Sequence, residues 1–116
     1  MDIYHIWCDL KPGQKDLEFV SHLKDYLDYL KTEQNLQTYR ITRRKLGLGP
    51  AELLEFHIML DFLNLSDLDA AFHHVATRTG AVESFHHAVN DRVNNVKFAL
   101  YRDFPDDVRQ EGGEKF

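Results

Sequence analysis

Two histidines are the residues of this chain with the clearest capacity for chemistry. His5 and His57 each stand in a stretch where apolar and polar side chains alternate. An imidazole titrates near neutral pH, so a pair of them is suited to passing a proton to or from a bound molecule. The alternative is that both are interface histidines hydrogen-bonded to carboxylates across a dimer, because buried polar groups need partners in any case. His5 and His57 are therefore candidate catalytic residues with a structural role left open.

Two arginines form a second candidate site. Arg40 and Arg44 fall on one face of a predicted strand, with Thr42 between them. Guanidinium groups at this spacing are suited to holding a carboxylate or a phosphate. The alternative is that they pair with Glu55 and Asp61 of a second copy of the chain.

The histidine content raises the question of a metal site. There are seven histidines, and two pairs are adjacent, His73-His74 and His86-His87. Consecutive helical residues diverge by about 100°, so neither pair binds one ion from one face. No HExxH spacing occurs, and a contact of His86 or His87 with His57 is the arrangement that would still allow a metal. We expect no bound metal.

Composition restricts the class of protein. The chain has 116 residues, enough for one core, with 43% hydrophobic and 28% charged residues, as in soluble domains. The net charge of −5 argues against a nucleic-acid partner. Cys8 is the single cysteine, which suits a reducing compartment. No leader and no membrane-spanning run is visible, so we expect no membrane partner and a cytoplasmic location.

The elements that position these residues follow from periodicity. In residues 54–62 the even positions are large and apolar and the odd positions are Glu55, His57, Met59 and Asp61, which indicates a strand with one buried face. The same reasoning predicts strands over residues 3–10, 37–46 and 96–101. Helical spacing predicts helices over residues 15–34, 66–80 and 81–93.

Turn and cap signals separate these elements. Residues 47–50, Gly-Leu-Gly-Pro, are expected to be a turn, because a dinucleotide fingerprint would need a third glycine and a following helix. We therefore expect no cofactor. Ser66 begins a capping-box-like sequence and is the expected cap of the helix that follows.

The order of elements predicts an α+β, ferredoxin-like βαββαβ fold. Two right-handed crossovers put the helices on one face of a four-stranded antiparallel sheet. We expect a single domain over residues 1–116, with a C-terminal tail from about residue 103.

The opposite sheet face has no covering element in this scheme. Ile3, Trp7, Met59 and Tyr101 would leave an apolar patch in water, which monomers usually avoid. We expect a homodimer in which a two-fold partner covers this open face, burying roughly 1,600 Å² and closing a polar-lined barrel.

Several stretches resemble a known family. They are residues 1–13, 39–50, 55–57, 86–90 and 101–105. Together they are similar to an uncharacterised family of small dimeric ferredoxin-like proteins in the dimeric α+β-barrel superfamily, over nearly the whole chain. The resemblance implies the fold and the dimer. The wider superfamily includes cofactor-independent monooxygenases, muconolactone-isomerase-like enzymes, haem-handling proteins and stress-related proteins, with sites between sheet and helices or within the barrel.

The function predicted from these patterns is binding of a small organic molecule, with isomerase-like or cofactor-free oxygenase chemistry if the protein is an enzyme. The alternative is a non-catalytic structural or interaction dimer whose polar barrel fixes the register of its subunits. The predicted pocket has His5 and His57 as acid/base residues, and its ligand-binding residues are Trp7, Arg40, Thr42, Met59 and Tyr101 on the sheet and Phe85, His86 and Asn90 on the helical side.

Overall fold

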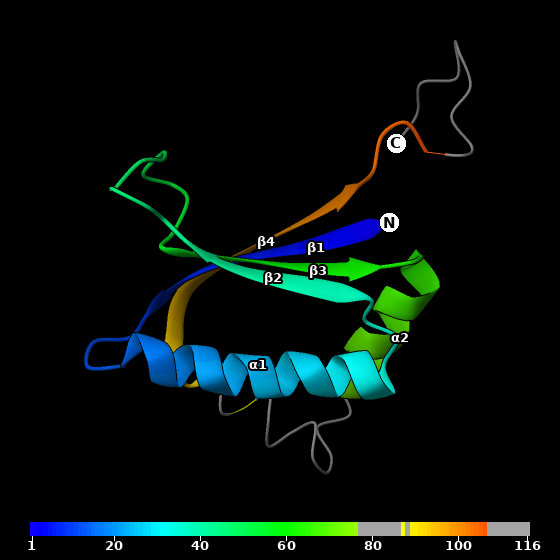
Figure 1. Cartoon of the computed structure of the whole chain (residues 1–116), viewed down its shortest axis with the longest axis horizontal. Helices are drawn as coiled ribbons and strands as arrows, with labels where there is room; N and C mark the ends of the chain where they lie inside the picture. Colours follow the sequence, from blue (N-terminus) through cyan, green and yellow to red (C-terminus); the bar gives the residue numbers. More distant parts are fainter. Residues whose placement is uncertain (77–86, 88, 107–116) are drawn as a thin grey trace.

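A computed structural model describes residues 1–76, 87 and 89–106 of the chain. Its elements are β1 (Asp2–Leu10), α1 (Asp16–Glu33), β2 (Thr38–Arg43), β3 (Phe56–Phe62), α2 (Leu65–Ala76) and β4 (Val93–Arg102). The sheet has the order β2-β3-β1-β4, and every neighbouring pair is antiparallel. Both helices lie on one face of the sheet (Figure 1). The ferredoxin-like βαββαβ fold predicted from the sequence is therefore confirmed.

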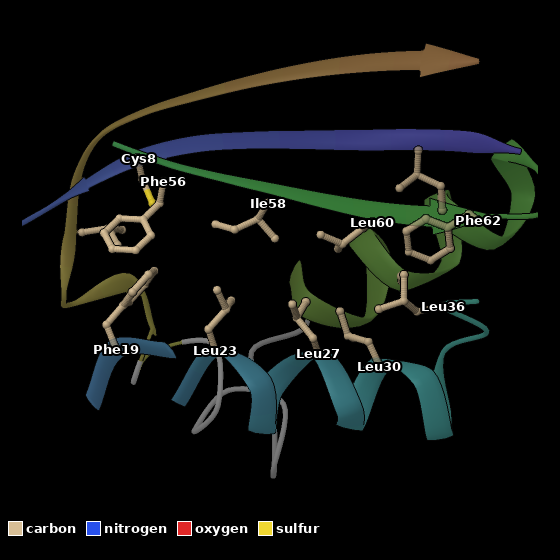
Figure 2. Close-up of a cluster of buried hydrophobic side chains, with 13 residues drawn as sticks. Cys8, Phe19, Leu23, Leu27, Leu30, Leu36, Phe56, Ile58, Leu60 and Phe62 are labelled. Atoms are coloured by element: carbon tan, nitrogen blue, oxygen red, sulfur yellow. The ribbon is translucent and has the colours of Figure 1, made fainter. Parts of the chain in front are cut away.

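The core forms between α1 and the inward face of the sheet (Figure 2). Helical spacing along α1 and two-residue spacing along β3 each produce one apolar row, and every member of both rows is buried. Phe19 of α1 meets Phe56 of β3 edge to face, with ring centroids 5.1 Å apart. These rows hold the sheet at a fixed distance from α1. The buried side chains of the two rows are Phe19, Leu23, Leu27, Leu30, Phe56, Ile58, Leu60 and Phe62.

The hairpin between β2 and β3 is confirmed, but its strands are shorter than predicted. β2 ends at Arg43 instead of residue 46, and β3 begins at Phe56 instead of residue 54. Leu46 has φ 56° and Gly47 has φ 67°, left-handed values that end a ladder. Residues 44–54 are therefore a loop.

The start of α2 also differs from the prediction. The helix begins at Leu65, and the Asn64 side-chain oxygen accepts a hydrogen bond from the Asp67 amide at 2.8 Å. Asn64 is thus the cap and Ser66 lies inside the first turn, so the prediction for Ser66 is wrong. Within the described part of the chain, neither helix has the length and hydrophobicity needed to cross a bilayer.

The edge strand β4 is only partly buried on its helix-facing side. It begins at Val93, which we had assigned to a helix, and its pairing with β1 shifts between Trp7 and Asp9 of β1. Phe98 stacks on Tyr4, with ring centroids 5.7 Å apart, yet it is 60% exposed. Phe98 therefore contacts the core at Tyr4 but is not itself buried.

Candidate functional site

The sheet face turned away from the helices carries the predicted polar site residues. In the antiparallel register, His57 of β3 lies opposite Trp7 of β1 and Thr42 of β2. His5 lies opposite Met59 of β3 and Ala99 of β4. We call this surface the open face. Its residues are Ile3, His5, Trp7 and Asp9 of β1, Arg40 and Thr42 of β2, His57, Met59 and Asp61 of β3, and Lys97, Ala99 and Tyr101 of β4.

The two histidines are in direct contact. His5 Nδ1 lies 2.8 Å from His57 Nε2, within hydrogen-bond distance, so one nitrogen donates and the other accepts. Burial lowers the pKa of His5, against a smaller opposing effect of Asp61. Burial also lowers the pKa of His57, and the neighbouring His5 lowers it further. Both imidazoles are therefore neutral at pH 7, the form in which a histidine accepts a proton.

Aromatic rings extend this pair across the sheet. The Trp7 indole stacks on His57 with centroids 4.5 Å apart and planes 9° from parallel. Tyr101 meets His5 edge-on at 4.8 Å. Trp7, His57, His5 and Tyr101 thus form a continuous row, which we call the ring row, and their mutual contacts restrict the rotamers of both imidazoles.

The ring row makes the histidine pKa values measurable by fluorescence. Trp7 is the single tryptophan of the chain, and a protonated imidazole in contact with an indole quenches its emission. We expect Trp7 fluorescence to fall on acidification with a midpoint below pH 6.5, because the pKa of His57 is lowered. Because His5 also stacks on Trp7 with centroids 5.5 Å apart, the double variant His5→Gln/His57→Gln should remove this transition, whereas His22→Gln on α1 should leave it. A midpoint above 6.5 would contradict the environment described for His57.

The same lowered pKa values affect folding stability. Because the unfolded chain binds protons at these two histidines from about pH 6.5 downward and the folded chain does so only at lower pH, the free energy of unfolding decreases as the pH falls through this window. Above pH 6.5 the pair makes no such contribution to the pH dependence.

The predicted arginine pair is not formed. Arg40 is exposed on the open face, but the Arg44 guanidinium donates to the carbonyl oxygens of Pro50 and Leu53. Glu55, one of the carboxylates considered as a partner from a second copy, binds Arg43 of its own chain at 2.6 Å.

Two threonines of β2 hold this edge strand against β3. The Thr42 hydroxyl donates to the His57 carbonyl oxygen at 2.8 Å. The Thr38 hydroxyl donates to the Asp61 carboxylate at 2.7 Å. Both bonds join β2 to β3, so the hydroxyl hydrogens of Thr42 and Thr38 are already used within the chain.

Of the three residues expected to close the pocket from the helical side, the structure describes Asn90. Asn90 lies on the other side of the sheet from the ring row, where it lines a cavity with Ile58 and Cys8. Phe85 and His86 lie outside the described residues.

The helical histidines that the structure describes do not form a metal site. His87 pairs with Asp91 at 3.0 Å, and His57 contacts His5, so His87 and His57 are each engaged with other residues. Among residues 1–76, 87 and 89–106, no group of three histidine, cysteine or acidic side chains is arranged to hold a metal ion.

A cavity of about 410 Å³ that was not predicted from the sequence lies between the sheet and the helices. Apolar side chains of α1, β1 and β3 form most of its wall, together with the hydroxyl-bearing rings of Tyr4 and Tyr26 and the amide of Asn90. Burial raises the pKa of Tyr26 to about 12, so its phenol stays protonated at neutral pH. Phe72 and Phe98 line the cavity and are 44% and 60% exposed, which places its mouth between α2 and β4. The one signal in the sequence was tyrosine at two core-facing positions.

Comparisons with known proteins identify similar chains. A family model described as a family of unknown function, DUF6614, matches residues 1–116. No curated protein matches the chain. Among solved structures, a dimeric ferredoxin-like protein of unknown function from Jannaschia sp. CCS1 is 13% identical and superposes with a TM-score of 0.63, covering 89% of this chain and 100% of that one.

Two further similar structures are named as enzymes. SnoaB, a cofactor-independent oxygenase from Streptomyces nogalater, is 7% identical with a TM-score of 0.61, covering 90% of this chain and 95% of that one. A hydroxynitrile lyase from Passiflora edulis is 12% identical with a TM-score of 0.65, covering 90% and 96% respectively. At these identities the likeness concerns the fold.

Proposed function

Because this chain belongs to the DUF6614 family, whose function is unknown, we propose a function from its own residues: a homodimer that binds a small, mostly apolar organic molecule between its sheet and helices. The cavity of about 410 Å³ carries this proposal. Small-molecule sites usually measure about 300–1,000 Å³ and combine apolar walls with a few polar groups. Here Tyr4, Tyr26 and Asn90 would supply those groups, and no cofactor is required.

Dimerisation is proposed from the open face. No described element covers this surface, and Ile3, Trp7, Met59 and Tyr101 lie on it. A second copy related by a two-fold axis would cover all of these side chains at once. The Jannaschia protein of similar fold is named as dimeric, which supports the same assembly here. We further propose that residues 1–116 act as a single domain in the cytoplasm, since one buried cysteine suits a reducing compartment.

Two neighbouring alanines of α2 test the cavity. Ala71 is buried and lines the cavity, whereas Ala70 is exposed. We expect Ala71→Phe to fill part of the space and weaken binding of the apolar probe 1-anilinonaphthalene-8-sulfonate at least about tenfold, or about 1.4 kcal/mol. Ala70→Phe should bind like the wild type. The measurement is a fluorescence titration, with circular dichroism to verify folding.

A second filling variant protects this test against misfolding. Ile6→Phe enlarges a side chain on the β1 wall of the same cavity. If folded Ala71→Phe and Ile6→Phe proteins both bind the probe with wild-type affinity, the cavity is not the binding site.

The 2.8 Å contact between His5 and His57 favours a second candidate function, proton transfer inside the closed barrel. One neutral imidazole would remove a proton from carbon next to a carbonyl while the other stabilises the charge, and Arg40 on the same face would hold an anionic substrate group. SnoaB, of similar fold, is named as a cofactor-independent oxygenase, and such chemistry needs no metal.

Deuterium exchange tests the proton-transfer function. In deuterated buffer, the wild type should accelerate exchange at the methyl group of acetophenone, measured by proton NMR. We expect His57→Gln to slow the protein-dependent exchange by about 10²–10⁴-fold, the usual contribution of a general base. His22→Gln should not change it, and light scattering should show that both variants remain dimeric. Equal rates in wild type and His57→Gln would exclude this role.

A further inference from the structure

The loop between β2 and β3 exposes large apolar side chains. We call residues 44–54 the arm. Leu46 is 81% exposed and Leu48 is 76% exposed. Figure 1 shows the arm rising from one end of the sheet, on the side opposite α1. The arm therefore stands beside the open face, at one of its two ends.

The shape of the arm is fixed by its own hydrogen bonds. The Arg44 guanidinium donates to the carbonyl oxygens of Pro50 and Leu53. The Leu48 amide donates to the Lys45 carbonyl oxygen at 3.0 Å. Gly49 passes so close to Arg44 that an added Cβ would lie 3.1 Å from its Nε. These contacts hold the two leucines away from the chain's own core.

The arm is also fastened to the sheet. Lys97 of β4 donates from Nζ to the Glu52 carbonyl oxygen at 2.6 Å, across the open face. The Glu55 amide, just after the arm, donates to the Asp9 carboxylate at 3.0 Å. The arm therefore has a defined shape and projects from the sheet, with Leu46 and Leu48 facing outward from the chain.

Large aromatic side chains are also exposed at the opposite end of the sheet, at and just beyond the end of β4. Tyr101 is 60% exposed and Phe104 is 77% exposed, where β4 rises away from the helices (Figure 1). β1 runs from one end to the other with nine residues, a length of about 30 Å at 3.3 Å per residue. Arm and β4 end therefore cannot meet within one chain, although both border the open face.

We propose that the arm of each protomer docks on the β4 end of a second copy, with Leu46 and Leu48 covering Tyr101 and Phe104. This rests on the homodimer proposed above. A two-fold axis that lies between the two sheets and runs perpendicular to their strands reverses the strand direction of the second copy. Each arm then meets the β4 end of the other copy, so the same contact forms twice in the dimer. Because Tyr101 is the outer member of the ring row, the second copy's arm would close the barrel beside His5.

Paired cysteines test this docking. In Leu48→Cys/Phe104→Cys, a disulfide must join two copies, because the two positions lie at opposite ends of one sheet. We expect mild oxidant to give a covalent dimer of about 27 kDa, twice the 13.6 kDa of one chain, on a non-reducing gel. Leu17→Cys/Phe104→Cys is the matched control, since Leu17 is 81% exposed but lies on α1. The native Cys8 is 2% exposed, and burial raises its pKa to about 12, so it should stay unreactive.

The outcomes separate the docking from the dimer. If the double variant scatters light as a dimer but forms no more covalent dimer than the Leu17 control, the docking is wrong and the homodimer stands. If Leu48→Cys alone cross-links efficiently, the arms meet each other and the docking is also wrong. If the wild type scatters light as a monomer, both proposals fail.

Discussion

Replacing Trp7 with glutamate is expected to convert the protein from a dimer of about 27 kDa, twice 13.6 kDa, to a monomer of 13.6 kDa. Trp7 lies on the central strand β1, between His57 of β3 and Lys97 of β4. A carboxylate there would remove a large stacking surface and place charge inside the barrel. Buried interface tryptophans often contribute more than 2 kcal/mol, so with the added charge we expect the dimer dissociation constant to rise at least about 1,000-fold, or about 4 kcal/mol. Light scattering over a concentration series measures this.

Leu17→Glu is the matched control for Trp7→Glu. Leu17 lies on α1 and is 81% exposed, so a charge there meets only solvent. This variant should remain dimeric. The proposed interface would be wrong if Trp7→Glu stayed dimeric at micromolar concentration with an unchanged dissociation constant.

Replacing Phe19 with alanine is expected to lower the free energy of unfolding by about 3–5 kcal/mol, the usual cost of removing a buried phenylalanine ring. Phe19 is 0% exposed and packs against Phe56, joining α1 to β3. Its ring also forms part of the cavity wall, so its loss enlarges a space that is already open. Urea denaturation followed by circular dichroism measures the change.

The control for Phe19→Ala is Leu17→Ala, two residues earlier on the same helix. Leu17 is exposed, so its truncation should change the free energy of unfolding by no more than about 0.5 kcal/mol. A loss below about 1 kcal/mol for Phe19→Ala would mean that the sheet and α1 are not joined through this contact.

The faces of the strands were predictable because side chains of a strand alternate with a period of two. The acids and His57 among the apolar residues of β3 showed which side faces away from the core. The meeting of His5 with His57 followed from the same alternation, once β1 and β3 were taken as neighbours. What alternation does not contain is the diagonal contact between their rings, which depends on the register of the two strands.

The features that the sequence did not predict depend on long-range contacts or on small local differences. The turn at residues 47–50 was predicted, but residues 44–46 and 54 were predicted as strand, and the contacts of Arg44 with the Pro50 and Leu53 carbonyls show a longer loop. Asn64 and Ser66 are both good helix caps, so local chemistry alone does not choose between them. The cavity is the space left between packed side chains, and the sequence lists the side chains without their packing.

The backbone of the central strand β1 is all that separates the cavity from the ring row. Tyr4, Ile6 and Cys8 border the cavity, while the intervening His5 and Trp7 stand in the ring row on the reverse side. A ligand in the cavity that displaces the side chains on that side must also shift the β1 backbone, which carries His5 and Trp7. The fluorescence of Trp7 should therefore change when a ligand fills the cavity, even though the ligand does not contact the indole.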